Sequence, residues 1–257
     1  MIMKKFIYIF SALLLLAGTS AANAQGYHRH PHPHHYESAA EGLGLHFGYA
    51  HSFYRVSDKF TDNVEPMGAK DGFHVGLTKD FTLIPYTLYI NSGLDYVYLQ
   101  DNPDIDKIGP LKVIAKSQDH RLNIPVKLKY EYPVTPIISA FAEVGPSLSF
   151  GLASNLKYRA RTENGASAGV RYNYFSGKIK TTGEADIMKE FLQAQAPDSK
   201  YRRFDAMLGG AVGAKFFDIL EVSLGYDWGI VNQYRGVISK DYKLRRQQLY
   251  VTVGVRF

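Results

Sequence analysis

The sequence predicts an all-β protein, an eight-stranded antiparallel up-and-down transmembrane β-barrel. Three observations predict this fold: eight segments of alternating apolar and polar residues, connections that alternate between long and short, and an export signal at the N-terminus. After that signal, no stretch approaches the roughly 20 continuous apolar residues of a spanning helix. A chain of 257 residues with 46% hydrophobic residues is also too long for a disulfide mini-protein and too apolar for a disordered chain.

Residues 1–24 are predicted to form a signal peptide. Lys4 and Lys5 supply the basic start, residues 6–17 are apolar, and residues 22–24 form an A-x-A cleavage motif. The mature chain is therefore expected to be exported, and without cysteine its stability does not depend on disulfides. Removing the two lysines from the 30 basic side chains leaves 28 against 24 acidic ones, a net +4 that indicates no nucleic-acid partner.

The segment 25–39 is expected to be a His-rich periplasmic tail. Its five histidines are His28, His30, His32, His34 and His35. Imidazole binds Zn, Cu and Ni, so the tail is predicted to bind such a metal weakly, and no other cofactor is expected. Interleaved prolines disfavour a helix or strand there, and the alternative interpretation is a polar tether.

The predicted barrel, residues 40–257, consists of segments with a period of two residues. In one of the most regular, Leu122, Ile124 and Val126 share one face while Arg121 and Asn123 share the other. The eight predicted strands are 43–50, 73–78, 86–99, 121–130, 138–152, 204–216, 220–230 and 248–257. An even number of strands is what a single-chain bacterial barrel requires.

The connections between these segments alternate in length. The longer ones are 54–70, 100–118, 153–203 and 232–244, and the short ones are 82–85, 131–137 and 217–219. Outer-membrane barrels have long loops outside and tight turns on the periplasmic side, so both termini are expected in the periplasm.

The polar strand face is predicted to point inward, because it combines many glycines with charges of both signs. An eight-stranded barrel has just enough room for side chains, and enclosed charges must pair. The predicted lumen charge network is Asp95, Arg121, Lys127, Lys129, Glu143, Asp205, Lys215, Glu221, Asp227 and Arg256. These residues indicate a plugged polar lumen rather than a pore, with His46 as a hydrogen-bonded filler.

The connection 153–203 is strongly basic. Its ten cations are Lys157, Arg159, Arg161, Arg171, Lys178, Lys180, Lys189, Lys200, Arg202 and Arg203, against five acids. Facing outward, they could bind phosphates of lipopolysaccharide or an acidic partner, or form a solvated loop. Thr181 and Glu184 also match a capping box that opens a helix through Gln195, which would cap the barrel mouth or dock another protein.

Several stretches resemble the PorT-like outer-membrane β-barrel proteins. They are LNIPVKLKY at 122–130, AEVGPS at 142–147, FD at 204–205, YDWGI at 226–230 and VTVGVRF at 251–257. The resemblance covers roughly residues 40–257 and implies an outer-membrane location, with outer-membrane lipid and lipopolysaccharide as surroundings. The terminal Phe257 resembles the assembly signal that the barrel-assembly machinery reads during insertion.

Most members of that family have no assigned activity, and one namesake serves in assembling a secretion apparatus. The resemblance therefore implies a non-enzymatic structural or interaction role, with an accessory component of a secretion or surface-assembly complex as the alternative.

A lipid-modifying barrel enzyme is the less favoured alternative. Such enzymes place histidine with serine or aspartate near the outer rim, where this chain has His51, His74 and His120 with Ser52 and Ser117 nearby. The alternation directs His51 and His120 toward lipid and His74 toward the lumen. No triad is therefore expected, and the sequence predicts no catalytic residue.

Overall fold

The structure, a computed structural model, describes residues 43–57, 68–101, 112–161, 167–183, 190, 200–235 and 243–256. The predicted signal peptide, the His-rich tail and Phe257 lie outside these described residues. Within the described ranges, no helix is both long enough and apolar enough to cross a membrane.

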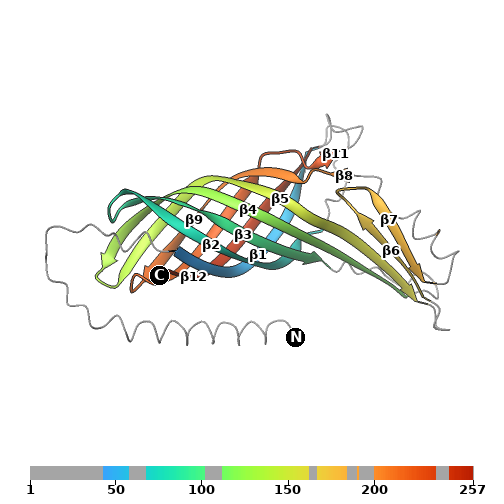
Figure 1. The fold of residues 1–257 in the computed structure, drawn as a ribbon, viewed down its shortest axis with the longest axis horizontal. Helices are drawn as coiled ribbons and strands as arrows, with labels where there is room; N and C mark the ends of the chain where they lie inside the picture. The colour runs from blue at the N-terminus through green and yellow to red at the C-terminus, as the bar shows by residue number, and fades with distance from the viewer. Residues whose placement is uncertain are drawn as a thin grey trace.

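Eight antiparallel strands close into a barrel (Figure 1). They are β1 (Leu43–Ser57), β2 (Lys70–Ile84), β3 (Leu88–Asp101), β4 (Lys112–Thr135), β5 (Ile138–Arg161), β9 (Phe204–Phe216), β10 (Leu220–Gly229) and β12 (Lys243–Arg256). Each strand pairs with its neighbour along the chain, and β1 pairs with β12 to complete the ring. The predicted fold class is therefore confirmed.

The strands β4 and β5 are much longer than the alternation predicts. Each has 24 residues, so β4 begins at Lys112 and β5 continues to Arg161, where loops were expected. A hairpin of β6 (Ser167–Asn173) and β7 (Lys178–Gly183) adds to the outer part of β5. Figure 1 shows this four-stranded extension reaching beyond the other barrel strands. The expectation of one long loop over 153–203 is wrong because backbone pairing continues past the apolar band.

The predicted capping box is also wrong. Thr181 lies within β7, opposite Val170 of β6, so it cannot begin a helix. Most of the predicted helix lies outside the described residues. Within 184–199 the structure describes Glu190, which is helical. Two short strands, β8 (Lys200–Tyr201) and β11 (Tyr234–Arg235), pair with each other separately.

Tight turns join the strands at the other end of the barrel. Phe217 and Asp218 have φ of 54° and 58°, and the Ile219 N–H donates to the Phe216 carbonyl oxygen at 3.0 Å. Two positive φ values are the signature of a type I′ turn, whose twist matches that of the flanking strands. Arg256 pairs with Gly44 at this same end, where Figure 1 marks the C-terminus.

The two faces of the barrel are assigned as the sequence predicts. The aliphatic side chains point outward: Val212 is 61% exposed and Val144 is 59% exposed. The charged side chains point inward, where Lys129 is 1% exposed and Asp205 is fully buried. A soluble barrel would have the reverse arrangement, so this outer surface is suited to hydrocarbon.

Candidate functional site

The lumen near the tight turns holds a cluster of two cations and two anions from four strands. Lys129 Nζ lies 3.0 Å from Asp80 Oδ2 and 2.7 Å from Glu221 Oε1. Arg256 binds the same two carboxylates, with Nη1 3.2 Å from Asp80 Oδ2 and Nη2 3.0 Å from Glu221 Oε2. Each charge is therefore compensated twice, which offsets the cost of removing these groups from water.

Further ion pairs occupy the rest of the lumen. Lys127 Nζ lies 3.2 Å from Asp227 Oδ1 and 3.6 Å from Glu143 Oε1, and it also donates to the Tyr250 hydroxyl. Lys215 pairs with Glu131. These ion pairs therefore connect β4 with β5, β9 and β10 across the inside of the barrel.

Toward the outer end, Arg246 is the central cation. Its Nε donates to Asp205 Oδ2 at 3.1 Å, and its Nη2 donates to the Ser149 hydroxyl at 2.9 Å. Arg121 lies nearby, fully buried, with Nη2 3.5 Å from the Tyr54 hydroxyl oxygen. Of the ten residues in the predicted charge network, Arg121 is the one that the structure does not bring into a direct ion pair among the described residues.

The sequence interpretation missed five charged partners in the lumen, which are Lys70, Asp80, Asp119, Glu131 and Arg246. All five lie one to three residues beyond the ends of predicted strands, and two of them, Lys70 and Glu131, fall in predicted connections. The alternation of faces, continued past the predicted strand ends, could have identified them. Asp80 lies two residues after Thr78 and Arg246 two residues before Gln248, so both belong to the lumen-facing side of their strands.

Two histidines converge on one carboxylate in the middle of the lumen. Asp95 Oδ1 lies 3.1 Å from His46 Nε2 and 3.3 Å from His74 Nδ1, and the three ligand atoms lie within 4.8 Å of one another. A divalent ion could be held by such donors, while the hydrogen bonds alone already satisfy them. The adjoining cavity has a volume of about 90 Å³, which is large enough to hold water.

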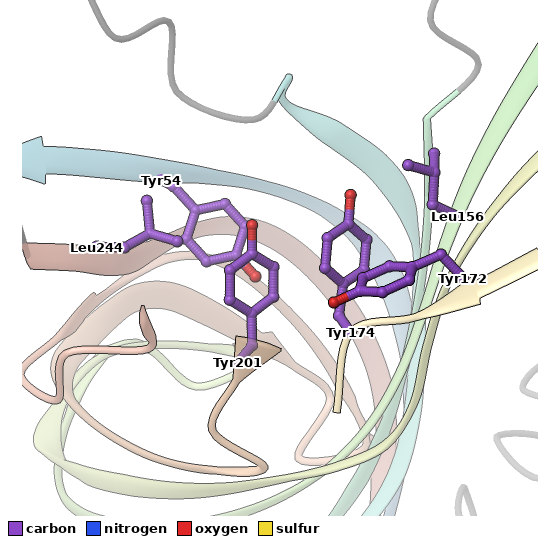
Figure 2. Packing of buried hydrophobic residues seen from close by; sticks show 6 residues of the cluster. All are labelled: Tyr54, Leu156, Tyr172, Tyr174, Tyr201 and Leu244. Atoms are coloured by element: carbon purple, nitrogen blue, oxygen red, sulfur yellow. The ribbon is translucent and has the colours of Figure 1, made fainter. Parts of the chain in front are cut away.

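An aromatic cluster spans the outer end of the barrel (Figure 2). Its buried members are Tyr54, Leu156, Tyr172, Tyr174, Tyr201 and Leu244. The rings of Tyr174 and Tyr201 stack with centroids 4.7 Å apart and planes 8° apart. Burial raises the pKa of Tyr174, so its phenol stays neutral. The cluster joins β1 and β12 to β5 and β6 at this end of the barrel.

The rim histidines lie on different faces. His51 Nδ1 is 2.7 Å from Asp71 Oδ1 on the outer surface, and His120 Nδ1 is 2.6 Å from the Tyr96 hydroxyl. His74 points into the lumen, as does Ser52, whose hydroxyl donates to the Gln247 carbonyl oxygen at 3.0 Å. These groups do not form a serine–histidine pair.

Comparison with known proteins agrees with this architecture. A family model described as outer membrane protein beta-barrel domain matches residues 23–235. No curated protein matches the sequence. Solved structures similar to this chain include Ail of Yersinia pestis in complex with the heparin analogue sucrose octasulfate, at 10% identity over 84% of this chain and 99% of that one, with a TM-score of 0.40.

Two further similar structures are outer-membrane proteins. OprG from Pseudomonas aeruginosa has 11% identity over 85% of this chain and 96% of that one, with a TM-score of 0.40. The outer membrane protease OmpT from Escherichia coli has 8% identity over 85% and 97%, with a TM-score of 0.36. The family match spans most of the chain, and it agrees with an apolar exterior around a charged lumen. This chain is an outer-membrane protein and belongs to the family of the outer membrane protein beta-barrel domain.

Proposed function

We propose that this protein is a non-enzymatic outer-membrane barrel with a structural or interaction role, a plugged polar lumen, and basic surfaces facing outward. The observation that carries the proposal is the packing of side chains inside the barrel. Buried ion pairs such as Lys127–Asp227 lie within the lumen, and the aromatic cluster lies at its outer end, which supports a plugged lumen. A solute channel would need a continuous wet path, whereas a closed barrel presents its outer surface to partners.

The alternative proposal is an accessory component of a secretion or surface-assembly complex. The resemblance to PorT-like proteins supports it, and the exposed extension built from β4 to β7 provides a surface for a protein partner. Purification of the protein from crosslinked native membranes distinguishes the two proposals. A stoichiometric partner protein would favour the accessory role, and recovery of the barrel alone would favour the structural one.

The proposal excludes lipid modification. His51 has an aspartate partner on the outer surface, but Ser52 points into the lumen. The mass spectrum of lipid A from a deletion strain is therefore expected to coincide with that of its parent. A new or missing acyl or phosphate species would overturn the non-enzymatic assignment.

The orientation of the barrel gives a separate prediction. With the tight turns in the periplasm, protease applied to intact cells should cut between Asn155 and Lys200 and spare the His-rich tail. The fragments would be identified by mass spectrometry. Cleavage in the tail without cleavage of the 155–200 region would mean that the barrel faces the opposite way.

Weak binding of Zn²⁺, Cu²⁺ or Ni²⁺ by the tail is proposed on the ligand chemistry of its histidines. Calorimetric titration of the mature protein with Zn²⁺ should show binding that is lost when residues 28–35 are deleted. A His46→Gln variant serves as the control and should bind as the unchanged protein does. If the deletion retains binding and His46→Gln abolishes it, the metal is held by His46, His74 and Asp95 instead.

A further inference from the structure

Four cations lie in one row across the outer extension of the sheet. In the strand register, Lys116 of β4 is opposite Lys157 of β5, Lys157 is opposite Arg171 of β6, and Arg171 is opposite Lys180 of β7. Directly paired residues of neighbouring strands point to the same face of a sheet. We call these four residues, Lys116, Lys157, Arg171 and Lys180, the cation row.

The cation row points away from the barrel interior. Its neighbours along the strands, among them Leu156 and Tyr172, are buried in the aromatic cluster on the opposite face of the sheet. Arg171 and Lys180 are exposed, and Lys116 and Lys157 are half-buried. The row therefore continues the outward face that carries Ile124 and Leu128 further down β4, the face that meets lipid.

Among the residues that the structure describes, no carboxylate neutralises the row. The one acidic residue in the described outer parts of β4 and β5 and in β6 and β7 is Asp119, which is buried on the other face and pairs with Lys70 at 2.9 Å. Two neutral amides hold the row in place instead: Lys157 Nζ donates to Gln118 Oε1 at 2.8 Å, and Arg171 Nε donates to Asn155 Oδ1 at 3.1 Å. Within the described part of the chain, none of the four forms an ion pair.

This arrangement costs stability in the absence of an anion. Neighbouring strands are about 4.8 Å apart, and like charges directly opposite each other in a sheet repel. The pKa of Lys157 is lowered, first by burial and then by Arg171, Lys116 and Arg159. The repulsion is relieved when an anion lies between the side chains, because each phosphate oxygen can accept charge-assisted hydrogen bonds.

The position of the row identifies the anion. Lys116 is four residues beyond His120, which packs against Tyr98 in a belt of polar aromatic residues at the upper edge of the lipid-facing surface. Four residues correspond to about 13 Å along a strand, so the row lies at the level of head groups rather than of hydrocarbon. Spanning four strands, the row is about 14 Å long and matches a ligand with several phosphates.

We propose that the cation row is a binding site for the multiply phosphorylated saccharide head groups of glycolipids in the surrounding outer leaflet. This inference rests on the proposed function, in which the outer surface of the barrel is the surface that binds other molecules. The flanking cations Arg159 and Lys178 lie on the same face, in the rows on either side, and widen the site.

The test uses the full-length mature protein in a neutral detergent, titrated with bisphosphorylated lipid A and with the same lipid A stripped of phosphate. Native mass spectrometry would count bound lipid. The double variant Lys157→Gln with Arg171→Gln should bind bisphosphorylated lipid A at least tenfold more weakly, and raised salt should weaken binding of the unchanged protein. Lys116→Gln with Lys180→Gln, at the ends of the row, should give a similar loss.

The matched control is Lys200→Gln with Arg202→Gln, which removes two exposed cations outside the row and should change affinity by less than about twofold. Equal binding by the row variants and the unchanged protein, or equal binding of phosphate-free lipid A, would overturn the proposal. Row-dependent binding of heparin without row-dependent binding of lipid A would assign the surface to a soluble polyanion and likewise overturn it. Heat-modified electrophoretic mobility and membrane fractionation report separately whether each variant is still an inserted barrel, so failure of this proposal is distinct from failure of the proposed function.

Discussion

Lys127→Met should lower the free energy of unfolding of the barrel by about 3–5 kcal/mol, because it removes one partner of a buried ion pair. Lys127 compensates both Asp227 and Glu143, and among the described residues neither carboxylate has a second cation within ion-pair distance. Methionine has similar length, so the change removes charge while leaving little cavity. Urea unfolding in lipid vesicles measures the effect, followed by the fluorescence of Trp228, the single tryptophan, which lies on the outer face.

Two comparisons make this result specific. Lys178→Met removes an exposed lysine and should cost less than about 1 kcal/mol. Adding Asp227→Asn to Lys127→Met removes one uncompensated carboxylate and should recover part of the loss. If Lys127→Met is no more destabilising than Lys178→Met, water solvates the lumen charges and the lumen is not plugged.

Val212→Arg should destabilise the inserted barrel by roughly 2–4 kcal/mol, the cost of a cation on the lipid face near the bilayer midplane. Val212 is surrounded by apolar neighbours, opposite Leu224 on β10 and Ala142 on β5. Leu208 and Trp228 lie beyond it toward the outer edge, and Phe216 lies toward the tight turns. The same unfolding measurement in vesicles applies.

Val134→Arg is the matched control. Val134 is 58% exposed, but it lies at the end of β4, next to the tight turn that leads into β5. Near the interface the same substitution should cost about 0–1 kcal/mol. Equal effects at the two positions would contradict a bilayer around the exposed aliphatic face, because water does not distinguish the two sites.

Much of the barrel could be predicted from sequence because alternation is a local property. The segment 204–216 is predicted with the bounds that β9 has, since Leu208, Val212 and Phe216 recur on one face while Asp205, Gly209, Gly213 and Lys215 recur on the other. The prediction stops early in β4, where Lys116 and Gln118 replace aliphatic residues on the outer face. Once a strand leaves the membrane both of its faces can be polar, and the period of two disappears although backbone pairing continues.

The candidate sites, like the strands, could be predicted only in part from the sequence. The sequence indicated which charges face the lumen, but the partners were not readable from it, because Lys127 and Asp227 are 100 residues apart. The basic character of the 153–203 region was also evident, yet Lys116 lies outside it and the alignment of four cations depends on the strand register. The alternation restricts register only to shifts of an even number of residues, so the cations that stand opposite one another are known only once the strands have paired.

The sequence by itself determined the strand faces, the even number of strands and the closure that an amphipathic antiparallel chain requires in a membrane. These follow from periodicity and from the cost of unpaired backbone groups in hydrocarbon. Only the tertiary structure decided which lumen charges meet, that side chains from β1, β5, β6, β8 and β12 gather in one cluster at the outer end, and that the cations of β4 to β7 form a row. These arrangements depend on contacts between residues far apart in the chain, and such contacts exist only once the strands have paired.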